Sequence, residues 1–271
     1  MKSRQFAPWL AVACIGAFTS ALAQSSAPMT PSGVAKGGYL AAGAGPDTLH
    51  ILPPPPAPGS AREAGDHAVF AATRALAGQP RWTLAKQDAN LIQGAGMFSC
   101  AIGVKLDPST APGLSALFRR VGADTVGVID PPKDHYARAR PYMAADAGSA
   151  PVCVPKSDGL TRNSSYPSGH ASISWTWGLI LAELAPDRAT EILARARSIG
   201  ESRVVCGVHY PSDIEAGRTT GSSLVAALHG DAVFRADMEH ARAELAGLRA
   251  GARAAPADCT AQNEAAAHSP Y

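Results

Sequence analysis

Apolar residues recur at intervals of three and four along most of this chain, which is the spacing of one face of an α-helix. Seven segments carry this pattern or connect directly to one that does: residues 61–77, 83–102, 112–128, 168–184, 187–206, 212–228 and 232–248. No segment sustains the alternation of apolar and polar residues that marks a half-buried strand. The sequence therefore predicts an all-α domain.

Two of these segments differ in how much of their surface is apolar. Residues 168–184 carry a wide stripe that includes Ile173, Trp177 and Leu181, which predicts a central and mostly buried helix. Residues 232–248 alternate charges of both signs, which predicts an exposed amphipathic helix.

The first residues have the pattern of an export signal. Lys2 and Arg4 precede an apolar run over residues 6–22, and residues 21–23 form a small-residue cleavage site. The run is short for a helix that spans a bilayer. We therefore expect residues 1–23 to be removed on export to the periplasm or the medium, with no stable membrane association afterwards.

Removal of this signal takes away two of the 24 basic residues and none of the 22 acidic ones, which leaves 22 of each sign. A balanced charge lacks the bulk basic field that binds nucleic acid or an anionic membrane.

The composition divides the mature chain into three parts. Residues 24–60 are rich in Pro, Ala, Gly and Ser and predict an extended arm. Residues 61–250 predict a single helical catalytic domain, and residues 251–271 predict a loose, Ala-rich tail.

Four cysteines remain once Cys14 leaves with the signal: Cys100, Cys153, Cys206 and Cys259. An even number in an exported chain predicts two disulfides, with three possible connectivities. A four-cysteine zinc site is the alternative, but the chain has no pair of cysteines two residues apart.

The first of three polar clusters runs from Lys133 to Pro141. Arg140 stands seven positions after Lys133, so on a helix that ends before Pro141 the two cations would share one face. Taken alone, this cluster is more typical of a solvated basic face.

The second cluster, from Ser165 to His170, precedes the most apolar segment. Ser168 is a suitable N-cap, and the free N–H groups of the following first turn form an anion site beside His170. The alternative is a simple turn that starts a helix.

The third cluster contains Arg203, His209 and Asp213. Arg203 and His209 converge if their helix ends near Gly207. Ser212 then forms a capping box with Glu215, and Asp213 in the next first turn can accept a hydrogen bond from His209. A lone histidine at a helix junction is the alternative.

Together the clusters supply three cations, two histidines, a carboxylate and a helix N-terminus, which are the groups that phosphoryl transfer to a histidine requires. His170, His209 and Asp213 could instead ligate a metal. Three cations in the same pocket would repel a divalent ion, so we expect neither a metal nor a cofactor.

The clusters match the three-part signature of the PAP2 superfamily: K-x6-R-P from Lys133, P-S-G-H from Pro167 and S-R-x5-H from Ser202. Most of the mature chain resembles the class A bacterial nonspecific acid phosphatases of that superfamily. The strings that carry this resemblance are Tyr39-Leu40, Leu52-Pro-Pro-Pro-Pro56, Asp88-Ala-Asn-Leu91 and Cys206-Gly-Val-His209.

The resemblance implies a helical bundle of the PAP2 and vanadium-haloperoxidase type, and a broad-specificity acid phosphatase that works through a phosphohistidine. His209 becomes the nucleophile, Asp213 its orienting partner and His170 the general acid. The phosphate-binding groups that it implies are Lys133, Arg140, Ser168, Arg203 and the Gly169 amide. It also implies a Cys153–Cys206 disulfide, which leaves Cys100 to pair with Cys259.

Three positions depart from the family pattern: Ser164, Ala171 and Tyr210 stand where Gly, Thr and Trp are common. These changes affect the mouth of the site and remove no catalytic atom. The expected partners are small phosphate esters and further copies of the chain in a homo-oligomer. Two other functions stay open, a vanadium-dependent haloperoxidase of the same fold and a periplasmic phosphate-binding module without turnover.

Overall fold

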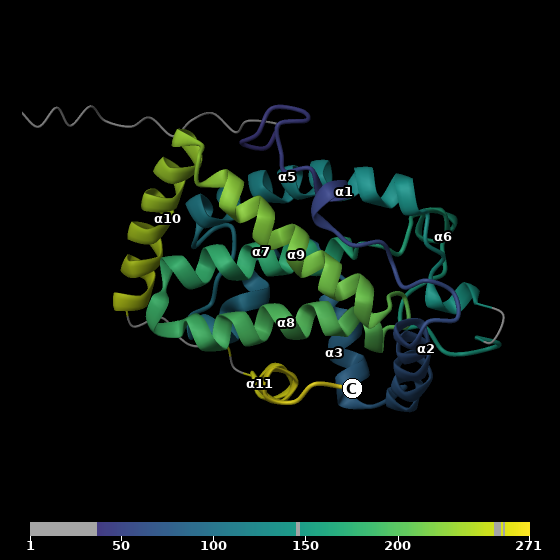
Figure 1. Ribbon diagram of the computed structural model, residues 1–271. Coiled ribbons are helices and arrows are strands. Elements are labelled where there is room, and N and C mark those ends of the chain that lie inside the picture. The colour runs from purple at the N-terminus through teal and green to yellow at the C-terminus, as the bar shows by residue number, and fades with distance from the viewer. Residues whose placement is uncertain (1–36, 145–146, 252–255, 257) are drawn as a thin grey trace, which may run out of the picture. The chain divides into compact units, whose positions relative to one another are not determined.

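The computed structural model describes residues 37–144, 147–251, 256 and 258–271. Over these ranges the chain forms helices joined by loops, without a strand (Figure 1). The prediction of an all-α domain is confirmed. The expected signal peptide, residues 1–23, lies outside the described ranges.

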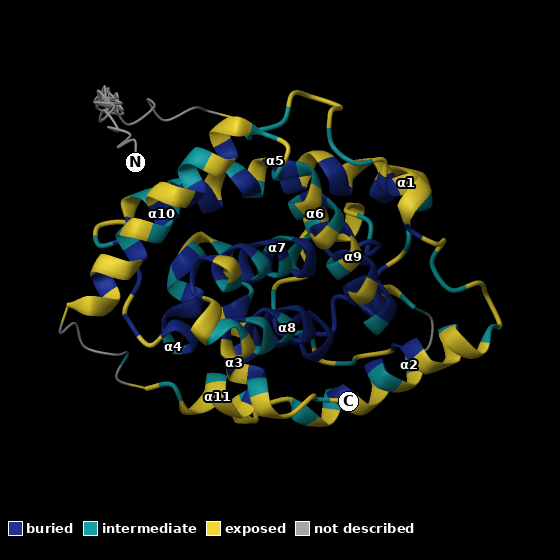
Figure 2. Ribbon diagram, turned by 60° about the vertical axis from the view of Figure 1, so that its left-hand side comes forward, coloured by how far each residue is buried: buried dark blue, intermediate teal, exposed yellow. Residues whose placement is uncertain are grey.

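Three helices bring the later two clusters together: α7 (Gly169–Leu184), α8 (Ala189–Val205) and α9 (Pro211–Leu228). Helix α7 has extensive contacts with both of the others, and Figure 2 shows α7 and α8 largely buried. Glycines permit this close packing, since a Cβ at Gly178 would lie 2.5 Å from the Cβ of Ala196, and one at Gly221 would lie 2.9 Å from the Ser172 carbonyl. The predicted central helix is confirmed.

Helices α5 (Pro112–Tyr136) and α10 (Ala232–Ala250) complete the main core around α7. Helix α10 buries one face, including Phe234 and Leu245, and exposes the other, as its charge pattern predicts. Helix α5 is longer than the predicted 112–128 because it continues through Pro131 and Pro132. Pro132 cannot donate to the Val128 carbonyl, which accepts a hydrogen bond of 2.6 Å from the Thr48 hydroxyl instead.

Thr48 belongs to a short helix, α1 (Thr48–Ile51), inside the arm that we expected to be extended throughout. The predicted single segment 83–102 is also broken. It forms α3 (Pro80–Asp88), the 3₁₀ segment η2 (Leu91–Phe98) and α4 (Ser99–Ile102), with Gly94 at a φ of 50° where the chain turns. Helix α2 (Ala61–Thr73) and η1 (Arg74–Leu76) precede them, and a short helix, α6 (Asp158–Arg162), lies in a segment for which no helix was predicted.

The C-terminal segment is not loose over its described residues. Helix α11 (Thr260–Ala267) packs against α8 (Figure 1). The Arg197 guanidinium of α8 donates to the Ala266 carbonyl at 2.6 Å. The Cys100–Cys259 disulfide ties the start of this helix to α4. An Ala-rich sequence without an apolar stripe gives no sign of this packing, because the tether comes from a cysteine 159 residues away.

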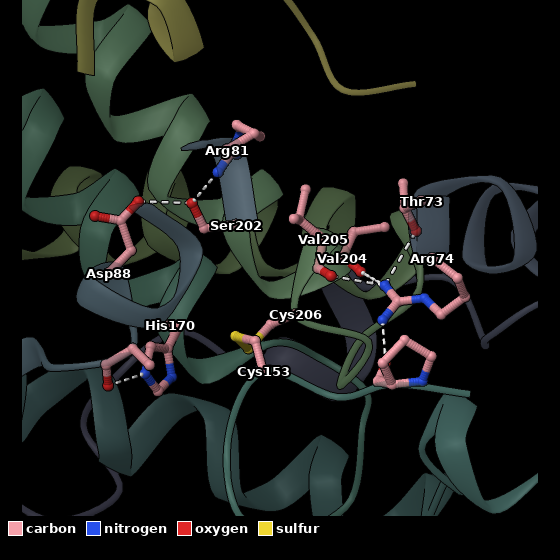
Figure 3. Close-up of a disulfide and its surroundings, with 12 residues drawn as sticks. Thr73, Arg74, Arg81, Asp88, Cys153, His170, Ser202, Val204, Val205 and Cys206 are labelled. Atoms are coloured by element: carbon pink, nitrogen blue, oxygen red, sulfur yellow. Dashed lines mark hydrogen bonds between the residues drawn. A yellow bond between two sulfur atoms is a disulfide. The ribbon is translucent and has the colours of Figure 1, made fainter. Parts of the chain in front are cut away.

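The second disulfide joins Cys153 to Cys206 at the end of α8 (Figure 3). The structure thus contains the two pairs that the family resemblance implied. None of the described helices is both long enough and apolar enough to cross a membrane.

Candidate active site

The three clusters meet at one end of the central helices. Lys133 lies in the last turn of α5, Ser168 caps α7 and Arg203 lies in the last turn of α8. The start of α7 touches the start of α9 directly, because the Ser168 N–H donates to the Asp213 carbonyl at 3.0 Å.

Lys133 and Arg140 do not share a helix, contrary to our expectation. Helix α5 ends at Tyr136, where Ala137 adopts a φ of 43°, and Arg140 follows in extended backbone. Asn163 joins the two cations instead, since its Oδ1 accepts from Lys133 Nζ at 2.9 Å and from Arg140 Nη2 at 3.3 Å. Nothing in the sequence marked Asn163, because its role depends on a loop 30 residues from Lys133.

The Arg140 guanidinium is fixed against the candidate nucleophile. Its Nε donates to the Leu160 carbonyl at 2.8 Å and its Nη1 to the Val208 carbonyl at 2.9 Å. The same Nη1 lies 3.1 Å from His209 Nε2. A guanidinium can only donate, so Nε2 presents a lone pair on this side.

The other ring nitrogen of His209 faces a carboxylate. His209 Nδ1 lies 3.3 Å from Asp213 Oδ2 and 3.3 Å from the Ser165 hydroxyl, which itself donates to Asp213 Oδ2. A proton on Nδ1 satisfies these acceptors and leaves Nε2 unprotonated. Ser165 was not predicted as part of the site.

The predicted capping box of Ser212 with Glu215 is wrong. Helix α9 begins at Pro211, so Ser212 lies within its first turn. Asp213 Oδ2 accepts from the Tyr210 N–H at 2.8 Å, and this contact holds the carboxylate over the helix N-terminus.

The bend between α8 and His209 is held by Gly207 and Arg74. Gly207 has a φ of 78°, and a Cβ there would lie 2.5 Å from Arg74 Nη1. Arg74 Nη2 donates to the Val204 and Val205 carbonyls at 2.8 and 2.7 Å, which adds donors for carbonyls in the last turn of the helix (Figure 3). The predicted helix end near Gly207 is therefore present.

The His170 ring is held by a backbone carbonyl from a distant part of the chain. Its Nε2 lies 3.1 Å from the Ala89 carbonyl, so this nitrogen carries the proton and Nδ1 is left for other partners (Figure 3). The adjacent Asp88 is itself fixed, because it accepts from Arg195 Nη2 and from the Ser202 hydroxyl, both at 2.6 Å.

Arg203 supplies donors without partners. Its side chain is 3% exposed, and neither Nε nor Nη1 has a hydrogen-bond partner in the described part of the chain. Burial and the nearby Arg140 lower the pKa of Arg203 to about 10. Burial of a guanidinium with two unpaired N–H groups costs free energy unless the group binds an anion. The unpaired Nε and Nη1 of Arg203 are therefore the clearest sign of an anion site.

The remaining titratable groups respond to burial and to these cations. Burial and then Arg140 lower the pKa of His209 well below its usual value, and burial and then Arg203 do the same for the pKa of His170. Burial also lowers the pKa of Lys133 to about 8. Among the described residues, no group of three or more His, Cys, Asp and Glu side chains could hold a metal ion.

Comparisons with known proteins identify the family. The model of the PAP2 superfamily matches residues 113–235, which include all three clusters. An acid phosphatase of Zymomonas mobilis is 44% identical over 209 residues, which cover 76% of this chain and 78% of that protein. The chain belongs to the PAP2 superfamily. A non-specific acid phosphatase of Providencia stuartii is 36% identical to this PAP2 chain, over 89% of the chain and 98% of the relative.

The crystal structure of a transmembrane PAP2-type phosphatidylglycerolphosphate phosphatase from Bacillus subtilis aligns with a TM-score of 0.45 and 18% identity, over 68% of this chain and 89% of that one. The family predicted from the three motifs is confirmed by the sequence comparisons, and the PAP2 chain is an enzyme of a phosphatase family.

Proposed function

We propose that this PAP2 protein is an exported, broad-specificity acid phosphatase that hydrolyses phosphomonoesters through a phosphohistidine at His209. One observation carries the proposal: the unprotonated Nε2 of His209 faces the Arg140 guanidinium at 3.1 Å, while its Nδ1 faces Asp213. A neutral imidazole oriented by a carboxylate and pointed into a cationic pocket is an activated nucleophile for a phosphate group.

In the first half-reaction, His209 Nε2 attacks phosphorus and the bond from phosphorus to the ester oxygen breaks. The cations neutralise the equatorial oxygens of the transferring group. His170 donates a proton from Nδ1 to the leaving oxygen, and Asp213 stabilises the imidazolium that forms. The groups assigned to the equatorial oxygens are Lys133, Arg140, Ser168, Arg203 and the Gly169 amide.

In the second half-reaction, neutral His170 takes a proton from the water that attacks phosphorus. The bond from phosphorus to His209 Nε2 then breaks, and inorganic phosphate leaves. The lowered pKa of His170 suits this role as a base. The negative charge of a bound ester opposes the cations and raises the pKa of His170, which allows it to carry the proton that the first half-reaction needs.

Export is supported by the charged and apolar pattern of residues 1–23 and by the two disulfides, since disulfides persist in oxidising compartments. We infer a periplasmic or secreted protein whose substrates are small phosphate esters.

The direct test of this function is release of inorganic phosphate from an aryl phosphate by the purified protein. We expect turnover that a chelator leaves nearly unchanged, because Lys133, Arg140 and Arg203 supply the positive charge. Vanadate and inorganic phosphate should inhibit by occupying the same pocket. Loss of most activity in chelator, restored by one added metal, would contradict the mechanism, and halogenation with vanadate, halide and peroxide but no phosphate release would favour a haloperoxidase.

The pH–rate curve should be bell-shaped with an acidic optimum. His209 must be neutral to attack, and its lowered pKa places the rise in rate well below the usual histidine value of about 6.5. His170 must be protonated in the substrate complex, so the rate falls again as pH rises through its pKa. Above a pH of about 8, loss of the Lys133 charge should also weaken phosphate binding. A rate that rises continuously to pH 9 would contradict these roles.

A further inference from the structure

The carboxylate of Asp213 has a second partner on the side turned away from His209. Its Oδ1 accepts a hydrogen bond of 2.6 Å from Arg138 Nη1, while Oδ2 serves His209. The Asp213 side chain is 0% exposed and that of Arg138 is 12% exposed. Arg138 lies inside the first cluster, but it is neither of the two cations that the family motif marks.

Arg138 is also bound to a carboxylate on a different helix. Its Nη2 donates to Asp66 Oδ2 on α2 at 2.8 Å. Asp66 is 3% exposed and accepts from the Ser212 N–H at 3.1 Å and from the Ser212 hydroxyl. Arg138 Nη1 reaches the same hydroxyl at 2.7 Å. The hydrogen bonds among Asp66, Ser212 and Arg138 form a closed ring, and Arg138 joins this ring to Asp213.

An aromatic side chain holds the plane of the guanidinium. Arg138 lies over the ring of Tyr210, 4.3 Å from its centroid, and Tyr210 stacks on His67 of α2. The guanidinium is thus fixed by two carboxylates, a hydroxyl and a ring. This geometry is typical of a side chain that orients another group.

The other charged groups near Asp213 have other roles in the proposed site. Lys133 of α5 and Arg140 of the following loop act on Asp213 through space, and both are assigned to phosphate binding in the proposed function. His209 and the Tyr166 hydroxyl are the other titratable groups that interact with it, while Asp66 and His67 of α2 lie behind Arg138 and Tyr210. Among the described residues, Arg138 is the cation in direct contact with the Asp213 carboxylate.

We propose that Arg138 and Asp66 are positioning residues that keep Asp213 ionised and aimed at His209 Nδ1, so that α2 helps to set the tautomer of the nucleophile. The inference rests on the proposed function. A buried carboxylate without a cation favours its neutral form, and a neutral Asp213 would neither hold the Nδ1 proton nor stabilise the imidazolium.

Arg138→Met tests the proposal. We expect the single-turnover rate of phosphoenzyme formation from an aryl phosphate to fall about 10- to 100-fold, by analogy with the loss of an outer partner that orients a metal-binding residue. Removal of the cation raises the pKa of Asp213, because Arg138 lowers it in the wild-type protein. Asp213 must be ionised for the reaction, so the acid limb of the pH–rate curve should move to higher pH. The KM and the inhibition by inorganic phosphate should change little, because the phosphate-binding cations remain.

Arg120→Met is the matched control. Arg120 Nη1 binds Asp237 at 2.9 Å, and its guanidinium lies 3.7 Å from the ring centroid of Tyr39, so the variant loses the same kinds of contact without touching Asp213. It should keep the wild-type rate and pH profile. Asp66→Asn weakens the hold on Arg138 but also removes a negative charge, so the single-turnover rate should fall by less while the acid limb does not move to higher pH. This variant decides the question if Arg138→Met does not fold.

A double variant separates orientation from general stability. In an Asp213→Asn background a neutral amide already replaces the carboxylate, so adding Arg138→Met should lower the rate little further. If the two residues acted independently, the fold-reductions in rate of the two substitutions would multiply. An acid limb that stays in place in folded Arg138→Met, or an unchanged single-turnover rate in Asp66→Asn, would overturn the inference while leaving the phosphohistidine intact. Wild-type protein that forms no phosphohistidine would contradict the proposed function itself.

Discussion

His209→Ala should abolish both turnover and the phosphoenzyme, with a loss in kcat on the order of 10⁶-fold, as for removal of the nucleophile in other covalent enzymes. The imidazole supplies the atom that accepts phosphorus, and Ala has no substitute for it. The neighbouring Arg140 and Asp213 keep their backbone partners at Val208 and Tyr210, so the fold should persist. Phosphate release and helical circular dichroism measure the two outcomes.

His229→Ala is the control for loss of a histidine. His229 lies at the end of α9, where it pairs with Glu183 at 3.0 Å and is 40% exposed, outside the site. This variant should turn over at the wild-type rate. Appreciable phosphoenzyme in His209→Ala, with a retained fold, would mean that another residue accepts the phosphate.

His170→Ala should slow phosphorylation by sugar phosphates far more than by aryl phosphates. A sugar alkoxide is a poor leaving group that needs the proton from His170, and a general acid contributes about 10² to 10⁴-fold. An aryl oxide leaves without that help. The variant should also accumulate phosphoenzyme from aryl substrates, because the same imidazole activates water in the second half-reaction.

Single-turnover rates of phosphorylation, measured with one ester of each kind, give this comparison directly. If both rates fall by the same factor, His170 is not the acid that protonates the leaving group. The His170 Nε2 contact with the Ala89 carbonyl would then serve only to fix the ring.

The residues of the predicted site could be found from the sequence because each cluster depends on local geometry. A Ser at a helix N-cap and a Gly that ends a helix impose their conformations over a few residues, and both Ser168 and Gly207 lie where the motifs predict. The length of α5 was not predictable in the same way. Its passage through Pro131 and Pro132 depends on Thr48, which is 80 residues from its partner at Val128.

The groups that support the site were missed for the same reason. Asn163 bridges two cations, Ser165 touches His209, and Asp66 reaches the site from α2 only after the chain has folded. A polar residue in a loop or on an exposed-looking helix face carries no local sign of such a contact. Family motifs mark the atoms that touch phosphate, whereas the partners behind them are seen only in three dimensions.

Mass spectrometry after an alkaline denaturing quench, which preserves the acid-labile P–N bond of a phosphohistidine, tests the central claim most directly when the protein has been mixed with a rapidly hydrolysed aryl phosphate. The quench traps the intermediate before water reaches it, and peptide mapping then locates the phosphate. The account predicts one phosphate on His209 of the wild-type protein. Phosphate on Ser168 instead, or turnover without any phosphorylated peptide, would contradict it.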